Sequence, residues 1–262
     1  MNGYAPLLSV RLSVDYPGRP AVLRDATFDV ERGEILGLVG ESGAGKSTLA
    51  LAILRLAGYR GANTSGEIRF QDRDLAPIPE REMRKVRGRE IAFVPQSPLS
   101  SLNPALTVGT HLNESWIAHA NGAVDRRRAR FLSLLESVSL PAEESFLKRY
   151  PGELSVGQAQ RLLIASAILH KPALLIAEEP TSALDMVTQA EILKLFNRLN
   201  EGLNMAVLYI SHDLLSVSSL CHRVAILNEG AVVECGPTEQ IFRNPQHPYT
   251  RRLIDAIPKH PF

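Results

Sequence analysis

The stretch with the clearest chemical meaning is Gly40–Ser47, GESGAGKS, which fits the phosphate-binding pattern G-x-x-x-x-G-K-[ST]. Its glycines let consecutive backbone N–H groups turn toward one anion, and a helix that follows adds its positive N-terminal end. Lys46 can reach the β- and γ-phosphates of a nucleotide, and the hydroxyl of Ser47 can bind Mg²⁺. The stretch, set between an apolar strand-like run and a helix-like run, therefore predicts a nucleotide site.

Two adjacent acids, Glu178 and Glu179, close the apolar run Ala173–Ala177 much further along the chain. Hydrolysis of a Mg²⁺-nucleotide needs one carboxylate that holds the metal and a neighbour that orients or deprotonates the attacking water. We expect Glu178 at the metal and Glu179 at the water. The alternative is a pair of solvent-exposed acids at the end of a strand.

A second candidate for anion binding is Leu154–Gln158, LSVGQ, which directly precedes a predicted helix. A serine hydroxyl and the unpaired N–H groups at a helix start suit a γ-phosphate. The alternative is that Ser155 serves only as the N-cap of that helix.

The elements that must position these residues alternate between strands and helices. Apolar runs and alternation predict strands at 8–14, 21–30, 35–39, 67–70, 91–94, 173–177, 205–210, 224–227 and 231–234. Helical spacing predicts helices within 48–54, 79–89, 106–147, 157–170 and 186–199, and residues 97–104 are predicted as a loop. This order indicates an α/β fold with a mainly parallel core sheet.

We expect the whole chain, 1–262, to form one domain. Within it the sequence indicates an N-terminal antiparallel β subdomain and a helical subdomain inserted at about 100–160. A C-terminal hairpin and helical tail are expected at about 222–262.

Composition and charge exclude several classes of partner and location. Lys and Arg number 29 and Asp and Glu 28, so no global field attracts nucleic acid, and the arginine-rich run Asp125–Arg130 is better explained as a solvated helix face. The spacing of Cys221 and Cys235 fits neither a metal cluster nor a disulfide framework, which favours a reducing cytosol. Met1–Pro6 does not resemble a signal peptide, and no apolar run approaches ~20 residues, so work at a membrane would require a partner.

Taken in order, the motifs resemble those of the ATP-binding subunits of ABC transporters over nearly the whole chain. The motifs are the phosphate loop Gly40–Ser47, Gln96, Leu154–Gln158, Glu178-Glu179-Pro180, Ser182–Asp185 and Ser211-His212. The resemblance implies a P-loop ABC cassette that hydrolyses ATP with Mg²⁺ as cofactor.

The resemblance also implies roles for individual residues around the nucleotide. The phosphates would be held by Gly40, Glu41, Ser42, Gly43, Ala44, Gly45, Lys46, Ser47 and Thr48. The metal would be held by Ser47, Gln96 and Glu178, with Lys46 among the catalytic residues. The signature residues Ser155, Gly157 and Gln158 would cover the nucleotide of a partner cassette.

Further roles follow for residues outside these loops. Tyr16 would stack on adenine, Gln96 would touch Mg²⁺ or water, Glu179 would be the catalytic carboxylate and His212 would contact the γ-phosphate. Asp185 would lie in the loop that couples the two cassettes. The alternatives are that Tyr16 is an edge aromatic residue and His212 a histidine at a strand end.

Two further segments are similar to the peptide/nickel importer group of this family: Ser100–Pro104, SSLNP, and Asn244–Leu253, NPQHPYTRRL. Many relatives in that group carry a C-terminal cysteine cluster for an iron–sulfur centre. Because no cysteine follows Cys235, we expect no iron–sulfur cluster here.

The resemblance therefore implies an ATPase subunit that drives import of peptides, nickel or a related small solute. Its partners would be a second cassette (a heterodimer, with a homodimer possible), permease subunits contacted through the loop after Gln96, and indirectly an extracytoplasmic solute-binding protein. No nucleic acid is expected. The chain would lie peripherally on the cytoplasmic face of the plasma (inner) membrane.

Two residues depart from the family pattern, because Glu178 stands where Asp is usual and Val156 where Gly is usual. A carboxylate displaced by about one ångström can slow a reaction on the order of a hundredfold. Val156 would lack the access of glycine to positive φ and would add bulk near a phosphate. These changes raise the alternative of a catalytically weak partner in an asymmetric heterodimer; a soluble ABC protein acting on DNA or ribosomes is disfavoured by the lack of tandem cassettes and long coiled-coil insertions.

Overall fold

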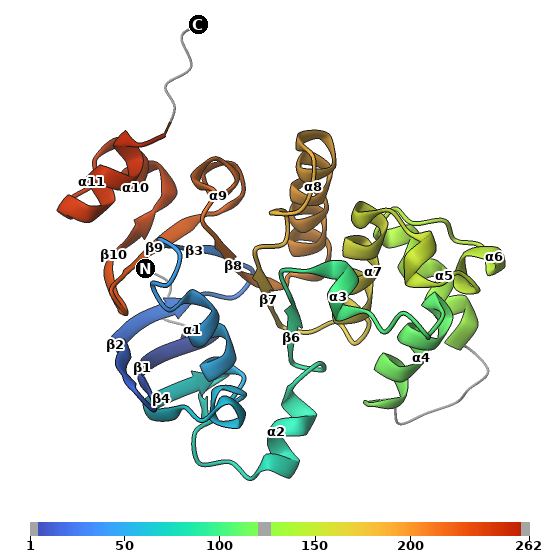
Figure 1. The fold of residues 1–262 in the computed structure, drawn as a ribbon, viewed down its shortest axis with the longest axis horizontal. Helices are drawn as coiled ribbons and strands as arrows, with labels where there is room; N and C mark the ends of the chain where they lie inside the picture. The colour runs from blue at the N-terminus through green and yellow to red at the C-terminus, as the bar shows by residue number, and fades with distance from the viewer. Residues whose placement is uncertain (1–4, 120–126, 258–262) are drawn as a thin grey trace, which may run out of the picture. The chain divides into compact units, whose positions relative to one another are not determined.

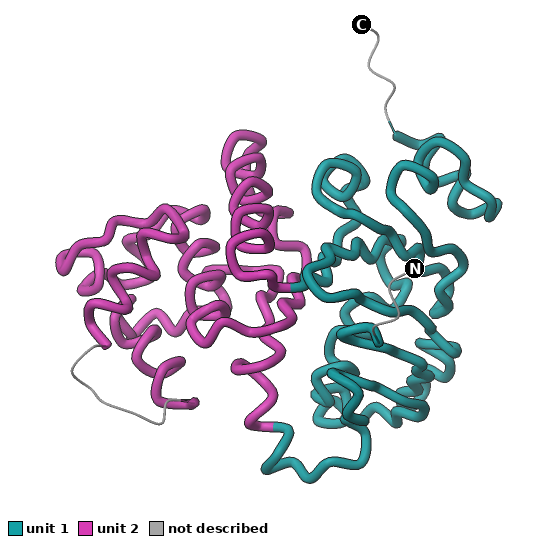
Figure 2. Tube along the Cα trace, turned by 180° about the vertical axis from the view of Figure 1, so that it is seen from behind, with its two compact units in different colours: residues 1–83, 206–262 teal, residues 84–205 magenta. Residues whose placement is uncertain are grey.

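The computed structural model describes residues 5–119 and 127–257. The chain divides into two compact units (Figure 2), of which unit 1 comprises residues 1–83 and 206–262 and unit 2 comprises residues 84–205. Unit 2 is thus one continuous insertion between the two segments of unit 1. Asp125 and Arg126, which begin the predicted arginine-rich helix face, lie outside the described residues.

Unit 1 contains a four-stranded sheet of order β2-β1-β4-β5, visible at the lower left of Figure 1. Its strands are β1 (Leu8–Tyr16), β2 (Arg19–Val30), β4 (Asn63–Phe70) and β5 (Arg73–Asp74). Every described pairing in this sheet is antiparallel. Along β1 the alternate residues Leu8, Val10, Leu12 and Val14 are buried, as period-two alternation requires. The expected N-terminal antiparallel subdomain is confirmed.

Unit 1 also contains strands in the order β10-β9-β3-β8. They are β3 (Ile35–Val39), β8 (Ala206–Ser211), β9 (Arg223–Asn228) and β10 (Ala231–Pro237). Strand β3 runs parallel to both β8 and β9, and β10 pairs antiparallel with β9. Every residue of β3 and β8 is buried, which explains their continuous apolar sequences. The other elements of unit 1 are α1 (Lys46–Ile53), η1 (Ala57–Arg60), α9 (Leu214–Leu220), α10 (Thr238–Arg243) and α11 (Pro248–Asp255).

The β9–β10 hairpin confirms the predicted turn and links the C-terminal segment to the N-terminal sheet. Glu229 and Gly230 both have positive φ, 46° and 82°, as a two-residue hairpin turn requires. The N–H of Arg24, on β2, donates to the carbonyl of Gly230 at 2.8 Å. A Cβ on Gly230 would lie 2.5 Å from the carbonyl oxygen of Val22, so this position has no room for a side chain.

Unit 2 contains the parallel pair β6 (Ile91–Val94) and β7 (Leu174–Glu178). The helices within it are α3 (Pro98–Ser101), α4 (Val108–Ile117), α5 (Arg127–Ser137), α6 (Glu144–Leu147), η3 (Pro151–Glu153), α7 (Val156–Ile168) and α8 (Met186–Leu203). Helix α2 (Glu80–Val86) leads into this unit. Helix α8 buries the stripe Ile192, Leu195, Phe196 and Leu199, with the spacing of one helix face. The α/β fold with an inserted helical region is confirmed.

The prediction of a loop over 97–104 is wrong for its first half, because residues Pro98–Ser101 form α3. The carbonyl of Ser97 accepts the N–H of Ser101 at 3.2 Å and its hydroxyl at 2.7 Å. Pro98 occupies the first helical position, where its missing N–H is not needed and its fixed φ suits a helix. Among the described residues, no helix combines the length and apolar character that spanning a bilayer would require.

The hairpin turns provide a test of how tightly the C-terminal segment is packed. Gly18→Ala and Gly230→Ala both place alanine at positive φ, which costs about 1 kcal/mol of folding free energy. Only Gly230 also has a backbone atom in the way, whereas nothing lies within 4 Å of a Cβ on Gly18. We expect Gly230→Ala to be the more destabilising change by about 1–3 kcal/mol in urea unfolding. Equal losses for the two variants would contradict the close packing.

Candidate functional site

The phosphate loop leaves the end of β3 and enters α1, and backbone atoms of two other strands enclose it. A Cβ on Gly40 would lie 2.2 Å from the carbonyl oxygen of Leu227, at the end of β9. Gly45 has φ 107°, and its Cβ would lie 2.7 Å from Leu23 Cδ2 and 3.0 Å from the carbonyl oxygen of Val22, on β2. Glycine is therefore required at both positions by space, and at Gly45 also by conformation.

The side chain of Lys46 lies along this loop. Its Nζ donates to the carbonyls of Gly40 at 2.7 Å and Glu41 at 3.0 Å, and the residue is only 9% exposed. Helix α1 begins with no side-chain cap and no acid in its first turn. Its first N–H groups and positive end thus suit an anion, and Ser47 is exposed on the same first turn.

His212 and the phosphate loop leave adjacent strands of one parallel sheet. In the β3–β8 pair Val39 is opposite Ser211, so Gly40 and His212 follow neighbouring carboxyl ends. This is the edge of a parallel sheet where ligands bind in α/β folds. The structure therefore brings the loop and the residues before His212 together.

Tyr16 lies apart from these strand ends in sequence and sheet. It is the last residue of β1, half-buried, and pairs with Arg19 across the hairpin. Both earlier interpretations, adenine stacking and an edge aromatic residue, fit this position.

In unit 2 the predicted polar residues also follow neighbouring strand ends. Val94 of β6 is opposite Ala177 of β7, so Gln96 and the pair Glu178 and Glu179 come from the same edge. Gln96 is exposed, Glu178 is half-buried and Glu179 is 8% exposed. The parallel pairing of two strands brings these three predicted residues together.

Glu179 has an unusual backbone conformation for its type. Its φ is 45°, in the left-handed region that non-glycine residues seldom occupy. Its carbonyl accepts from the N–H of Ser182 at 3.3 Å and from the Ser182 hydroxyl at 3.1 Å, so a tight turn holds this conformation. Such strain concentrates at functional sites, where it sets the direction of a side chain.

Ser155 is the N-cap of α7. Its hydroxyl accepts from the N–H of Gln158 at 3.2 Å, and Gln158 Oε1 accepts from the N–H of Ser155 at 3.1 Å. This reciprocal arrangement is a capping box. The N-cap interpretation is confirmed as a structural role, while contact with a nucleotide remains a prediction.

The concern that Val156 lacks a needed positive φ is wrong. Val156 is the first residue of α7 and is absent from the residues with positive φ. A first helical position accepts any side chain at modest cost. Only the added bulk of Val156, which is half-buried, distinguishes it from glycine here.

Asp185 caps helix α8, a role that sequence reasoning missed although Asp before a helical run is a capping signal. Its carboxylate accepts from the N–H groups of Val187 and Thr188 at 3.0 Å and from the Thr188 hydroxyl at 2.7 Å. The hydrogen bond from the Thr188 N–H, then that from its hydroxyl, lowers the pKa of Asp185. A Cβ on Gly157 would lie 2.7 Å from Thr188 Cγ2, so the signature loop packs on the residue that Asp185 holds.

The donors predicted for Mg²⁺ are suitable in kind. A nucleotide-bound Mg²⁺ takes few protein ligands, because phosphate and water oxygens fill the rest of its shell. Ser47, Gln96 and Glu178 offer oxygen atoms, each at a strand end or helix start. Among the described residues, no group of three or more His, Cys, Asp or Glu side chains gathers as a separate metal site.

Comparison with known proteins decides the family. A profile described as "ABC transporter" matches residues 23–182, and one described as "Oligopeptide/dipeptide transporter, C-terminal region" matches residues 233–261. The chain belongs to the ABC transporter family. It is an ATP-binding cassette with the ATPase activity of that family, whose members act as paired cassettes with membrane permeases.

Curated relatives extend over most of this chain. The dipeptide transport ATP-binding protein DppD of Escherichia coli K12 is 42% identical, covering 97% of this chain and 79% of DppD. The peptidoglycan transport ATP-binding protein YejF of Agrobacterium fabrum is 45% identical over 97% of this chain, which spans 47% of YejF. The glutathione import ATP-binding protein GsiA of Shigella dysenteriae is 42% identical over 91% of this chain, which spans 39% of GsiA. The chain thus spans less than half the length of the last two.

Solved structures confirm the cassette fold. A dimeric ATP-binding cassette, MJ0796, in a post-hydrolysis state bound to ADP and phosphate, has a TM-score of 0.75 and 28% identity over 88% of this chain and 98% of that one. The protein cbiO1 of Clostridium perfringens, part of an ABC transporter complex, has a TM-score of 0.78 and 25% identity over 97% of both chains.

The cap at Asp185 predicts a pH-dependent stability. Because folding lowers the pKa of this carboxyl, its contribution is present above about pH 4 and is lost as the pH falls through the folded-state pKa. Asp185→Ala should lower the urea midpoint at pH 7, and the gap to the unsubstituted protein should close at acid pH. Glu201→Ala, an exposed acid on the same helix, is the control and should show no such gap. A gap that persists unchanged at acid pH would contradict this account of the cap.

Proposed function

We propose that this chain is the ATP-hydrolysing subunit of an importer for peptides or a related small solute. The observation that carries the proposal is the presence, in one chain, of an ABC cassette and a C-terminal segment matching the oligopeptide/dipeptide transporter region. The names of DppD and GsiA, which cite dipeptide transport and glutathione import, support the same class of solute. The name of a further relative, a putative peptide import ATP-binding protein of Brucella abortus, also cites peptides, so peptides are the preferred class.

In the proposed reaction water attacks the γ-phosphate of ATP in line with the bond that breaks. The N–H groups at the start of α1 and the ammonium of Lys46 bind the β- and γ-phosphates, for which Lys46 must leave the carbonyls of Gly40 and Glu41. The carboxylate of Glu179 orients the water and accepts its proton, and His212 contacts the γ-phosphate.

Ser47, Gln96 and Glu178 are the residues proposed to hold Mg²⁺, which supplies positive charge to the phosphates when bound. The glutamate at 178 is one methylene longer than the aspartate usual in the family. It fits a metal held at a longer reach, or through water, from the end of β7.

A second cassette is the proposed partner on the nucleotide side. Ser155, Gly157 and Gln158 would cover the nucleotide of that cassette. Next to Asp185, Met186 is 86% exposed and Val187 71% exposed, and exposed apolar side chains of this size are typical of contact surfaces.

Each nucleotide site would take its phosphate loop from one cassette and its signature loop from the other. Glu178 would affect the site built on the phosphate loop of this chain, and Val156 would affect the site built on that of the partner. Such unequal changes favour a heterodimer of unequal cassettes over a homodimer. The same two residues support a second candidate function, in which this chain binds ATP but contributes little hydrolysis. The two candidates differ in one measurable respect, namely whether turnover by the pair depends on Glu179 of this chain.

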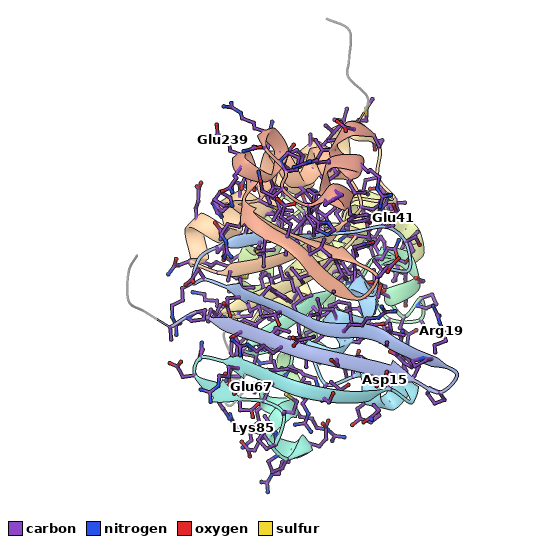
Figure 3. The ribbon with its side chains drawn as sticks, turned by 90° about the vertical axis from the view of Figure 1, so that its left-hand side faces the viewer. Asp15, Arg19, Glu41, Glu67, Lys85 and Glu239 are labelled. Carbon is purple, nitrogen blue, oxygen red and sulfur yellow. The ribbon has the colours of Figure 1, made fainter. Side chains whose placement is uncertain are left out.

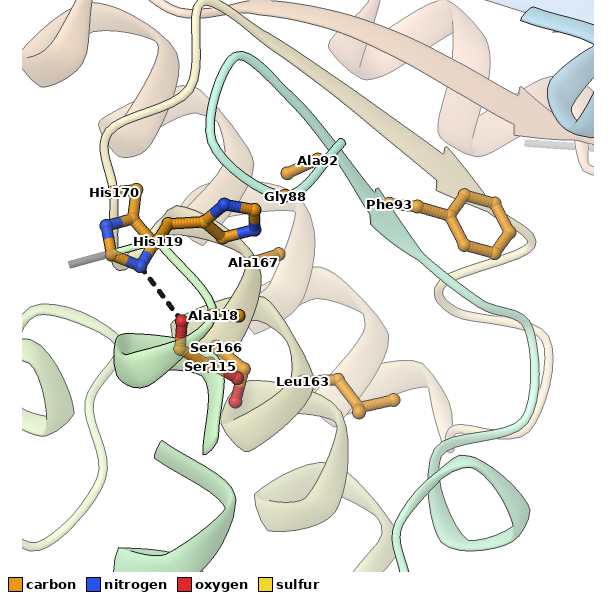
Figure 4. Close-up of a pocket in the computed structure, with 10 residues that line it drawn as sticks. All are labelled: Gly88, Ala92, Phe93, Ser115, Ala118, His119, Leu163, Ser166, Ala167 and His170. Atoms are coloured by element: carbon orange, nitrogen blue, oxygen red, sulfur yellow. Dashed lines mark hydrogen bonds between the residues drawn. The ribbon is translucent and has the colours of Figure 1, made fainter. Parts of the chain in front are cut away.

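Permease subunits are the proposed partners of unit 2, at the cytoplasmic face of the plasma (inner) membrane. Leu99, on α3 shortly after Gln96, is 45% exposed. A pocket of about 300 Å³ lies at β6, the strand that precedes Gln96. It is lined by Phe93 of β6, by Leu163 and by the rings of His119 and His170 (Figure 4). An exposed leucine and a partly apolar pocket suit an inserted segment of another protein.

Replacing the proposed catalytic carboxylate tests the assignment of this chain as the hydrolytic subunit. Glu179→Gln keeps the size of the side chain but cannot accept the proton, so ATPase turnover of the full chain with its partner cassette should fall by about a hundredfold or more. ATP affinity should stay within about twofold, since binding depends on the phosphate loop. Glu201→Gln, the same chemical change at an exposed residue of α8, should leave turnover unchanged.

The outcomes separate the candidates. Appreciable turnover that survives Glu179→Gln would place hydrolysis on the partner and establish the weakly catalytic alternative. Co-purification of the chain with ribosomes rather than with membrane permeases would contradict the transport function.

A further inference from the structure

A tyrosine from the C-terminal segment reaches the phosphate loop. Tyr249, in the first turn of α11, is 4% exposed, and its hydroxyl oxygen accepts the backbone N–H of Glu41 at 3.2 Å. Glu41, labelled in Figure 3, is the second residue of the loop, and it belongs with α11 (labelled in Figure 1) to unit 1. The described contacts thus join two segments separated by 208 residues in sequence.

The peptide group that Tyr249 binds is the one that holds the loop lysine. The N–H of Glu41 and the C=O of Gly40 belong to the same peptide bond, and that carbonyl accepts from Lys46 Nζ at 2.7 Å. Because a trans peptide is planar, its N–H and C=O point in opposite directions and rotate together. A hydrogen bond that fixes the N–H therefore also fixes the carbonyl that Lys46 contacts.

Helix α11 is itself anchored to the β9–β10 hairpin. The carboxylate of Glu234, on β10, accepts from the N–H groups of Gln246 at 2.8 Å and His247 at 3.0 Å. His247 Nδ1 then accepts the N–H of Tyr249 at 3.2 Å and caps α11. Strand β9 of the same hairpin carries Leu227, whose carbonyl lies against Gly40. The hairpin thus contacts the loop directly and also places Tyr249.

The ionisation states of these groups suit their roles. Burial raises the pKa of Glu234, but several hydrogen bonds to its carboxylate, first that from the Gln246 N–H, together lower it, so the net pKa is below the ordinary value and the carboxylate stays ionised at neutral pH. Burial raises the pKa of Tyr249, so its phenol stays neutral. The guanidinium of Arg252 lies 5.9 Å from the centre of the Tyr249 ring and helps to hold the ring in place.

We propose that Tyr249 is a positioning residue that prepares the phosphate loop for ATP by fixing the Gly40–Glu41 peptide and, through it, Lys46. Without the hydroxyl this peptide can rotate, and the loop then occupies additional conformations that do not bind phosphate. The apparent affinity for nucleotide falls by the fraction of molecules in those conformations. The proposal deepens the function proposed above and rests on ATP binding by this loop.

The substitution Tyr249→Phe removes the hydroxyl and keeps the ring. We expect the full chain to bind the non-hydrolysed analogue AMP-PNP, with Mg²⁺, about fivefold more weakly, the effect of losing one ordinary hydrogen bond. Tyr59→Phe, at a tyrosine that is 70% exposed, is the matched control and should bind as the unsubstituted chain does. In ATPase assays with the partner cassette, Tyr249→Phe should raise KM and leave kcat within about twofold, which is the signature of altered binding.

A second variant distinguishes positioning from general stability. Glu234→Gln weakens the anchor of α11 and should also raise the dissociation constant for AMP-PNP, but it should add no further rise in a chain that already carries Tyr249→Phe. Additive effects would mean that Glu234 does not act through the tyrosine and would overturn the proposal.

The remaining outcomes are also decisive. An unchanged or tighter dissociation constant for Tyr249→Phe, with or without a lower urea midpoint, would overturn the positioning role while leaving the proposed function intact. Failure of the unsubstituted chain to bind AMP-PNP would instead contradict the proposed function itself.

Discussion

The lack of room for a side chain at two glycines of the loop is the constraint on which the nucleotide site depends. The carbonyl of Leu227 occupies the space that a side chain would need at Gly40, and Leu23 Cδ2 with the carbonyl of Val22 occupies that space at Gly45. This close approach fixes the backbone path of the loop, and consecutive N–H groups in such a loop suit a phosphate. The constraint holds only if β9 and β2 keep their places, and the hydrogen bond from Arg24 to Gly230 joins the strand that carries Val22 to the hairpin that carries Leu227.

Local sequence patterns were enough to predict most of the fold and part of the site. The phosphate loop is contiguous, the apolar runs that form β3 and β8 allow only buried strands, and the parallel order then brings Gly40 and His212 to one edge. Two predictions were wrong because the local composition suggested one backbone conformation and the chain adopts another. Residues around Pro98 have the composition of a polar loop, yet the proline starts a short helix there. Val156 stands where glycine is usual in the family, yet it begins a helix with ordinary backbone geometry. The bond between Tyr249 and Glu41 has no local pattern at all, because it depends on where β10 and α11 fold.

Positive φ serves two opposite purposes in this cassette. At Gly45 it allows the chain to pass close to β2 where no side chain fits. At Glu179 a glutamate adopts positive φ, although its Cβ makes this conformation unfavourable, and the conformation sets the direction of its side chain. The first use is read from the sequence because glycine marks it. The second is invisible in the sequence, since nothing about a glutamate at a strand end indicates a left-handed backbone.

The two-segment construction of unit 1 has a consequence for biosynthesis. The loop motif is made before unit 2, but the strand that contacts Gly40 and the tyrosine that binds Glu41 are made after it. Domains generally fold as units during synthesis, so the motif lacks its contacts with Leu227 and Tyr249 while the whole of unit 2 is made. A nascent chain halted before β9 would carry an intact nucleotide motif and no formed nucleotide site. Competence to bind ATP therefore depends on residues made after unit 2, namely the β9–β10 hairpin and α11.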